Sequence, residues 1–326
     1  MEKYDVIVLG FGKAGKTLAG NFAKKGKKIA LIEENDEMYG GTCINIGCIP
    51  TKTMISNIDK CNSLYELNEI RDAVVTKLRN KNYKIRYNDF PGEGIPIIFI
   101  HGLGCAGSFD YVEIANRKEF LGHRKILIDL LGAGYSDKPL DFEYKVKNHA
   151  KYLSEFLEDL NLNKVILFGH SLGGAISIEL CGLCEEKIDR LILTEPNLDP
   201  ATKGRTSWAV AQYTEENYKS RINSLIEYCA SGKNTMWAAT LRNWLPEAAY
   251  QISRDAIEVR EVPWRDMFYS YKIPRFFIFG SKTLPSDDLE ELPKNNIEVK
   301  IVENAGHSMA WENPEGLAQV IYECLK

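Results

Sequence analysis

The sequence lacks the long apolar runs, the excess of one charge and the low-complexity segments that mark several classes of protein. No apolar run reaches the roughly 18 residues that a membrane-spanning helix needs. Lys and Arg number 41 against 45 Asp and Glu, for a net charge of −4. We therefore expect neither nucleic acid nor a membrane as a partner. The remaining composition, 44% apolar and 26% charged, is ordinary for a soluble globular protein.

The sequence also lacks a clear secretion signal and a concentrated set of cysteines. Its eight cysteines are scattered over 326 residues, which is not typical of a secreted disulfide framework. The first apolar run is short and leads into a glycine loop, with no small-residue cleavage site behind it. A cytoplasmic location is therefore expected. The length suffices for one large domain or two ordinary ones.

Two α/β patterns follow one another along the chain. In the first, an apolar run over residues 4–9 is followed by a glycine loop, a helix-like stretch over 13–25 and a second strand over 28–33. This order predicts two parallel strands joined by a crossover helix. Residues 58–82 are polar and are expected to form a helical connector.

The second pattern starts at residue 83 and alternates strand-like runs with helical segments. Strands are expected at 83–87, 97–100, 125–129, 164–168, 191–194, 275–279 and 298–302. The pattern predicts a doubly wound, mostly parallel sheet. Residues 196–272 contain no clear strand and are expected to form a helical cap rich in aromatic residues. These aromatics either line a substrate site or form the cap's own core; they are Trp208, Tyr213, Tyr218, Trp237, Trp244, Tyr250 and Trp264.

One short motif has the form of a serine nucleophile in its usual context. Residues 169–173 read Gly-His-Ser-Leu-Gly, a G-x-S-x-G motif between an expected strand and a helix-like run over 175–181. The tight turn needs small flanking residues and lifts the serine oxygen above the sheet. The helix N-terminus behind it favours developing negative charge. Chance matches to the motif are common, but a match in this context predicts Ser171 as the nucleophile.

A serine hydroxyl needs a base, and His307 is the best placed of the five histidines. It follows the last expected strand, in the chain order serine, acid, histidine. A lone histidine is usually structural, but the serine motif favours a catalytic role here. His170 adjoins the nucleophile and is expected to point away from it on the sharp turn. His123 and His149 are expected to be solvated.

An acyl-transfer site also needs two backbone N–H groups to bind the oxyanion. One is expected from Leu172, directly after the nucleophile. The other is expected from Leu103, in the glycine-rich loop that follows the expected strand 97–100. Glycines in that loop let the backbone approach a substrate closely.

Four stretches together closely resemble the α/β-hydrolase superfamily. They read HGLG at 101–104, DLLGAGYSDKP at 129–139, GHSLGG at 169–174 and AGHSMAWENP at 305–314. The resemblance covers residues 83–326. It implies an α/β-hydrolase fold with a helical cap, and it does not define a substrate.

The position of the catalytic acid departs from the commoner family pattern. Many relatives have an aspartate in a G-x-x-D text after the strand that corresponds to 275–279, but here Thr283 stands at that position. One branch of the haloalkane dehalogenases places the acid after the preceding strand, where this chain has Glu195. Glu195 is therefore the expected acid and Asp287 the alternative. Dehalogenase activity is not implied, because that family uses an aspartate nucleophile.

The N-terminal segment carries a different set of motifs. Gly10, Gly12 and Gly15 form G-x-G-x-x-G between a strand and a helix, and Glu33 ends the second strand where a ribose hydroxyl would bind. Residues 40–52, with Cys43 and Cys48, resemble the flavin-dependent disulfide reductases. In that family the two cysteines are a redox pair beside FAD.

This second resemblance stops near Asn57, whereas the family needs several hundred further residues. A second G-x-G-x-x-G at 102–107 belongs to the hydrolase pattern, since His101 and the serine motif fit that fold. A two-strand fragment buries too little apolar surface to hold FAD well. The join suggests a gene fusion or truncation.

Three segments are thus expected: a dinucleotide-binding-like fragment over 1–57, a helical connector over 58–82 and a hydrolase domain over 83–326. The expected function is serine hydrolysis of a carboxylic ester or similar small acyl compound, with no cofactor or metal required. The alternatives are flavin binding or disulfide oxidoreductase activity by the N-terminal fragment, and a hydrolase fold without catalysis.

Overall fold

The computed structural model describes residues 5–9, 18, 22, 25–32, 73–77, 83–120 and 122–326. The chain divides into two units, Met1–Cys61 and Asn62–Lys326. Among the described residues, none of the helices combines the length and the apolar character that crossing a membrane requires.

The first unit contains the two strands that the sequence predicts. β1 (Val6–Leu9) and β2 (Ile29–Ile32) pair in parallel, with Val6 opposite Ile29. The predicted parallel pairing is therefore confirmed. Within the helix expected over 13–25, the structure describes Leu18, Phe22 and Lys25. Leu18 and Phe22 are helical.

The second unit is built on an eight-stranded sheet with the order β10-β9-β8-β7-β5-β6-β4-β3. Pairing is antiparallel between β3 and β4 and between β4 and β6, and parallel for the other neighbours. The strands are β3 (Ala73–Lys77), β4 (Lys84–Phe90), β5 (Glu93–Ile100), β6 (His123–Ile128), β7 (Val165–His170), β8 (Ile188–Thr194), β9 (Arg275–Gly280) and β10 (Glu298–Val302). The predicted mostly parallel sheet is confirmed.

The helical connector expected over 58–82 is wrong at residues 73–77. These residues form the edge strand β3, in which Val74 pairs with Tyr87 of β4. The run Ala-Val-Val-Thr-Lys contains three β-branched residues, which favour an extended backbone over a helix. The sheet of the second unit therefore begins before residue 83, where the sequence pattern placed its start.

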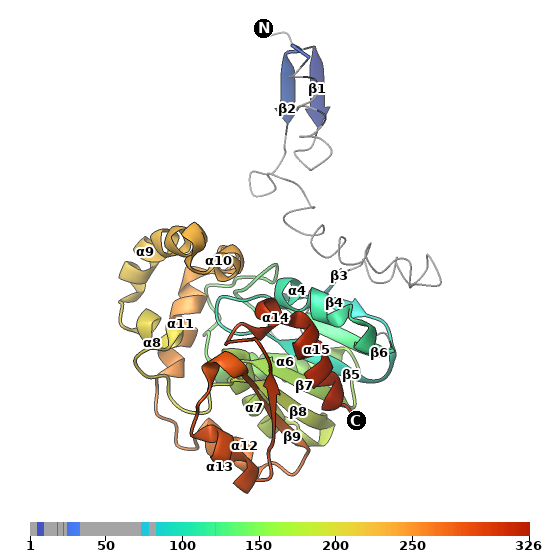
Figure 1. Cartoon of the computed structure of the whole chain (residues 1–326). Coiled ribbons are helices and arrows are strands. Elements are labelled where there is room, and N and C mark those ends of the chain that lie inside the picture. The colour runs from blue at the N-terminus through green and yellow to red at the C-terminus, as the bar shows by residue number, and fades with distance from the viewer. Residues whose placement is uncertain are drawn as a thin grey trace. The chain divides into compact units, whose positions relative to one another are not determined.

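Helices cover both faces of this sheet (Figure 1). In β5, Ile98 and Ile100 join one apolar cluster, whereas Ile97 and Phe99 join the other, as the twofold alternation of a strand requires. The first cluster includes residues of α6 (Val146–Asp159) and α7 (Leu172–Leu183). The second includes residues of α5 (Val112–Ala115) and α15 (Pro314–Glu323). The shorter helices of the sheet domain are α4 (Gly107–Asp110), α13 (Asp288–Lys294) and α14 (Met309–Glu312), with 3₁₀ turns at Lys118–Phe120, Glu185–Lys187 and Ser281–Thr283.

Helix α6 overturns the expectation that His149 is solvated. His149 is 2% exposed and lies in the buried face of the helix with Val146, Ala150 and Leu153. Burial disfavours the charged imidazolium and lowers the pKa of His149 to about 3. The spacing of these apolar residues follows one helical face, and that spacing was the signal for a buried histidine.

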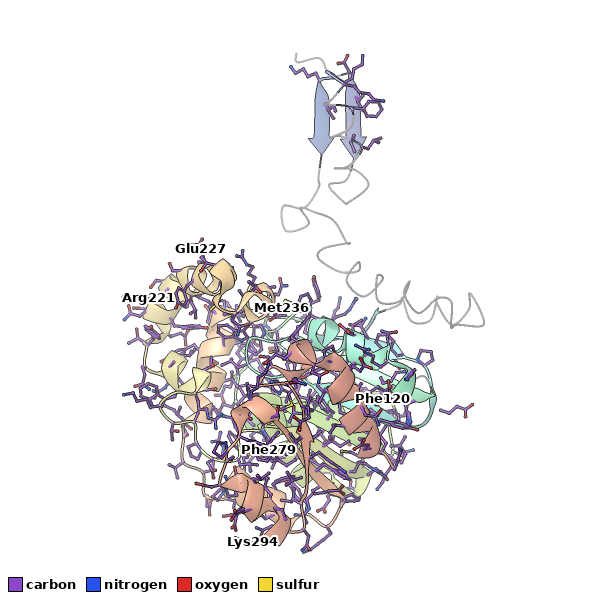
Figure 2. All side chains as sticks on the ribbon, in the orientation of Figure 1. Phe120, Arg221, Glu227, Met236, Phe279 and Lys294 are labelled. Carbon is purple, nitrogen blue, oxygen red and sulfur yellow. The ribbon has the colours of Figure 1, made fainter. Side chains whose placement is uncertain are left out.

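A helical cap lies between β8 and β9, as predicted. Its helices are α8 (Thr206–Ala211), α9 (Glu215–Tyr228), α10 (Thr235–Leu241), α11 (Pro246–Ala256) and α12 (Trp264–Ser270), with a π-helical turn at Cys229–Lys233. Arg221 and Glu227 of α9 project from the outer surface, whereas Phe279 lies inside the sheet domain (Figure 2).

The aromatic residues of the cap divide between its core and the site below. Tyr218, Trp244 and Trp264 are buried, with at most 5% exposure each, and pack into the larger apolar cluster. These three therefore support the cap itself. Trp237 is partly buried and lines the cavity described below.

Candidate active site

Ser171 sits at the sharp turn between β7 and α7. Its backbone has φ 53° and ψ −121°, a region that residues with a side chain rarely adopt. Close packing of the turn requires the following glycine: a Cβ on Gly173 would lie 2.4 Å from the carbonyl oxygens of Ile100 and His101. The small residues in the motif therefore let the elbow approach the end of β5 and hold Ser171 in its unusual conformation.

The structure brings Ser171, His307 and Glu195 together in one hydrogen-bonded series. The Nε2 atom of His307 lies 3.1 Å from the Ser171 hydroxyl, and its Nδ1 atom lies 2.7 Å from Oε2 of Glu195. An ionised carboxylate can only accept a hydrogen bond, so Nδ1 must donate to Glu195. In a neutral imidazole Nε2 is then left to accept the serine proton.

Glu195 is held by donors at the end of β9 and in the turn that follows it. Its Oε1 atom accepts hydrogen bonds from the backbone N–H of Gly280, at 3.0 Å, and from the Thr283 hydroxyl. Burial raises the pKa of Glu195, but the bonds from His307, Thr283 and Gly280 outweigh it and leave the pKa below its ordinary value. Thr283, which occupies the position of the usual aspartate, thus helps to keep Glu195 ionised.

Asp287, the alternative acid, is not in this series. It occupies the N-cap position of α13, where its carbonyl oxygen accepts from the backbone N–H groups of Glu290 and Glu291. Both ring nitrogens of His307 already contact Glu195 and Ser171. The geometry therefore places Glu195, and not Asp287, beside the histidine.

The expectation that His170 points away from the nucleophile is wrong. Its ring centroid lies 4.7 Å from that of His307, and its Nδ1 atom lies 3.0 Å from the Thr194 hydroxyl. His170 pairs with Thr194 in the sheet register, and paired residues project to the same face. Burial, together with the nearby His307, lowers the pKa of His170 to about 3, so this second imidazole stays neutral beside the proposed base.

The loop after β5 contains Leu103, one of the expected oxyanion donors. His101 is fully buried and anchors the loop: its Nε2 atom accepts from the Leu130 N–H at 3.0 Å, and its Nδ1 atom lies 2.9 Å from the Gly102 carbonyl oxygen. Leu172, the other expected donor, is the first residue of α7. The first N–H groups of a helix have no intrahelical acceptor, so this N–H is free to serve a ligand.

Two tryptophans of the cap bind the carbonyl oxygens of this loop. Trp237 donates from Nε1 to the Leu103 carbonyl at 2.9 Å, and Trp244 donates to the Cys105 carbonyl at 2.7 Å. Gly104, between Leu103 and Cys105 in the chain, has φ +75°. A Cβ at this position would lie 2.1 Å from Nε1 of Trp237. The sequence marked these tryptophans only as aromatic cap residues. Their hydrogen bonds connect the cap to the loop that would bind an oxyanion.

Replacing Trp237 with Phe should keep most of the ring packing and remove the hydrogen bond to Leu103. We expect kcat for ester hydrolysis to fall about 10-fold, less than the roughly 10²-fold loss caused by removing a direct oxyanion donor. Steady-state kinetics with a short-chain ester would measure this. Trp208→Phe, also in the cap, is the control and should change kcat by less than twofold. Equal losses in both variants would argue for a general effect of cap stability.

A cavity of about 660 Å³ opens onto Ser171. Leu103, Trp237 and His307 line it close to the nucleophile, and several polar side chains from the loop after β8 and from the cap line the rest. These polar side chains include Asn197, Asp199, Thr202, Arg205, Thr206 and Arg265. Of the seven cap aromatics named from the sequence, Trp237 alone lines this cavity within the described part of the chain.

The N-terminal candidates fall outside the described residues. They are Gly10, Gly12, Gly15, Glu33, Cys43 and Cys48. Within residues that the structure does describe, there is no group of three or more His, Cys, Asp or Glu side chains placed to hold a metal ion.

Comparison with known proteins identifies the larger part of the chain. Residues 95–314 match the family model described as alpha/beta hydrolase fold. The chain belongs to the α/β-hydrolase family. AB hydrolase superfamily protein YisY of Bacillus subtilis is 28% identical over 247 residues, which cover 71% of this chain and 91% of YisY. The solved esterase of Exiguobacterium antarcticum matches with a TM-score of 0.66 and 20% identity, covering 78% of this chain and 100% of the esterase.

The N-terminal part matches a second family. Residues 4–91 match the model described as pyridine nucleotide-disulphide oxidoreductase. Probable pyridine nucleotide-disulfide oxidoreductase RclA of Escherichia coli is 52% identical over 83 residues, which are 26% of this chain. The chain spans only 19% of the length of RclA. The family match runs beyond Asn57 and includes the residues of β3 and β4.

Proposed function

We propose that this α/β-hydrolase is a serine hydrolase that cleaves a carboxylic ester or a similar small acyl compound through an acyl-enzyme. The main support is the hydrogen-bonded series Ser171–His307–Glu195 at the floor of a substrate-sized cavity. A nucleophile bonded to a base, which is in turn oriented by a carboxylate, is the arrangement that acyl transfer requires. The uninterrupted series also disfavours a fold without catalysis.

In the proposed acylation step, Oγ of Ser171 attacks the substrate carbonyl carbon while Nε2 of His307 takes the hydroxyl proton. The N–H groups of Leu103 and Leu172 stabilise the negative charge on the carbonyl oxygen. Glu195 stabilises the imidazolium that forms. Collapse of the tetrahedral intermediate breaks the bond to the alcohol, which leaves with the proton from Nε2.

In the deacylation step, water attacks the acyl-enzyme carbonyl and gives a proton to Nε2. The second tetrahedral intermediate collapses, the carboxylic acid leaves, and Oγ of Ser171 regains its proton. All proton transfers pass through His307. The scheme uses only side chains and backbone groups of this chain, and we propose that it requires no metal or cofactor.

A panel of p-nitrophenyl esters of graded acyl length tests this proposal. Hydrolysis should be detectable for short acyl chains and accompanied by a pre-steady-state burst of p-nitrophenol wherever deacylation is the slower step. A fluorophosphonate probe should label Ser171 covalently, as peptide mass spectrometry would detect. The absence of both turnover and labelling in folded protein would overturn the proposal.

A second candidate is flavin binding by the N-terminal unit, favoured by the sequence match to RclA.

We propose that hydrolysis does not depend on this N-terminal unit. Deleting residues 1–61, which leaves the second unit with β3, should change kcat/KM for the ester panel by less than about threefold. Kinetics of the full and shortened chains would show this. Flavin absorbance in the purified full chain would favour the second candidate. Loss of hydrolysis in a folded shortened chain would contradict the independence of hydrolysis from this unit.

A further inference from the structure

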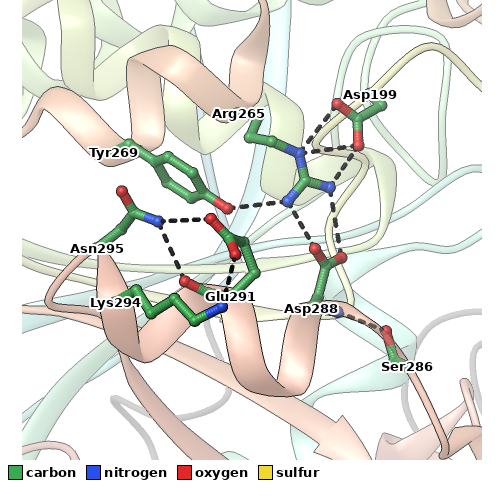
Figure 3. Close-up of polar contacts among 8 residues, drawn as sticks. All are labelled: Asp199, Arg265, Tyr269, Ser286, Asp288, Glu291, Lys294 and Asn295. Carbon is green, nitrogen blue, oxygen red and sulfur yellow. Dashed lines mark hydrogen bonds and ion pairs between the residues drawn. The ribbon is translucent and has the colours of Figure 1, made fainter.

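The guanidinium of Arg265 lies at the centre of a polar cluster beside the cavity (Figure 3). Its Nε atom donates to both carboxylate oxygens of Asp199 at 3.1 Å, and its Nη1 atom donates to Oδ1 of Asp288 at 2.6 Å and to the Tyr269 hydroxyl at 3.0 Å. Nη2 donates to both aspartates as well. All of the guanidinium's donor nitrogens are therefore engaged within the protein.

This cluster joins three segments that are far apart in the sequence. Arg265 is on α12 of the cap, and Asp199 is in the loop after β8, four residues beyond Glu195. Asp288 begins α13, five residues beyond Thr283. A backbone hydrogen bond of 2.9 Å from the Arg265 N–H to the Leu198 carbonyl strengthens the connection to the loop.

Two of these segments together hold the proposed catalytic acid. Glu195 begins the loop that contains Asp199, and its backbone has an unfavourable φ of 39°. Its carboxylate is bound by Gly280, the last residue of β9, and by Thr283, in the segment that leads to Asp288. A shift of the loop relative to this segment would therefore turn the carboxylate away from His307.

The electrostatics favour a clamp that is better shielded on its Asp288 side, since the Asp199 side chain is 52% exposed. Arginine binds carboxylates through two parallel hydrogen bonds, a geometry that a lysine ammonium cannot reproduce. The side chains of Arg265 and Asp288 are 24% and 28% exposed, so solvent screens this pair only in part. The hydrogen bond with Asp199 is the largest of the effects that raise the pKa of Arg265 above its ordinary value.

We propose that Arg265 is a positioning residue for the catalytic acid, which it acts on by clamping Asp199 and Asp288. The inference rests on the proposed function, since it requires Glu195 to orient His307. This positioning role differs from substrate binding, for which the guanidinium would need free donors. It also differs from a general role in cap stability, whose effect on kcat would not depend on Glu195.

A double-mutant cycle separates these roles. Arg265→Met is made in the wild-type chain and in the Glu195→Gln chain, and kcat and KM are measured with a short-chain p-nitrophenyl ester. In the wild-type background kcat should fall about 10- to 100-fold with KM within twofold, because small displacements in a catalytic site are costly. In the Glu195→Gln background the same change should alter kcat by less than twofold, since the residue through which it acts is already impaired.

Arg260→Met is the matched control. Arg260 is also a partly buried arginine close to α12, and it pairs with Asp255 at 2.9 Å. Its hydrogen bonds go to Glu258 and Asp255 and not to Asp199 or Asp288, so its loss should leave kcat within twofold of wild type. If Arg265→Met does not fold, as judged by circular dichroism, Arg265→Lys serves in its place. Lysine keeps the charge but cannot bind both aspartates in the same way. We therefore expect a several-fold loss of kcat in the wild-type background and not in the Glu195→Gln background.

Three results would overturn the inference. Equal losses of kcat in both backgrounds would show that Arg265 acts independently of Glu195. A raised KM with unchanged kcat would show that it binds substrate. If Glu195→Gln alone left kcat unchanged, the assignment of the acid would fail and the inference with it. The first of these results, if Glu195→Gln itself loses activity, would leave the proposed function standing.

Discussion

Replacing Ser171 with Ala should reduce ester hydrolysis by about 10⁴-fold or more, on the precedent of other serine triads. The alanine variant has no oxygen to attack the substrate carbonyl, and His307 is left without a proton to accept. The side chain is small, and its backbone strain is shared by the wild type, so the fold should persist. Steady-state kinetics with a p-nitrophenyl ester, together with circular dichroism, would measure both quantities.

Ser308 provides a control for this experiment. It also lines the cavity, beside His307, but has no role in the proposed proton transfers. Ser308→Ala should therefore keep kcat within a few-fold of wild type. A Ser171→Ala enzyme that retains a tenth of wild-type turnover would exclude Ser171 as the nucleophile.

Glu195→Gln should reduce kcat by roughly 10²-fold or more while the protein remains folded. The amide is nearly isosteric with the carboxylate, but it cannot stabilise the imidazolium that forms when His307 takes the serine proton. The amide would also need to present its oxygen to Nδ1 and to the donors on Thr283 and Gly280 at once. Turnover per folded molecule, with folding checked by thermal unfolding, is the relevant measurement.

Asp287→Asn is the parallel variant, because Asp287 was the alternative acid in the sequence. It caps α13 through its backbone, whereas the ring nitrogens of His307 contact Glu195 and Ser171. Its kcat should stay within a few-fold of wild type. The reverse ranking of the two variants would move the acid to the segment after β9 and return this chain to the commoner family arrangement.

The strands that build the site could be predicted because their sequences are continuous apolar runs. β5, β7 and β8 lie in the middle of a sheet covered on both faces, so each contains a buried apolar stretch, which is 97–100, 165–168 and 191–193 respectively. Edge strand β3 was missed because it is short and surrounded by polar sequence. Its identity depends on pairing with β4, which is a long-range contact that local patterns do not encode.

Glu195 could be suggested from the sequence because it directly follows the strand after which one branch of the haloalkane dehalogenases places its acid, and the carboxyl ends of parallel strands meet at one edge of the sheet. The donor role of Thr283 could not be predicted, because it depends on how the chain turns after β9. The orientation of His170 failed for a different reason. The sharp turn at Ser171 suggested that its neighbour points away, but the register of β7 with β8 sets the direction of that side chain.

The base of the proposed triad is attached to the edge of the sheet. His307 follows β10, which is an edge strand of the sheet. The histidine lies 136 residues from Ser171 in the chain. Edge elements open locally at a lower free energy than the strands between them. Partial unfolding of β10 would therefore disconnect the base while Ser171 and Glu195 remained on the central strands. Catalysis would then be lost at a lower denaturant concentration than the one that unfolds the whole sheet. Inactivation and global unfolding should therefore be separable transitions.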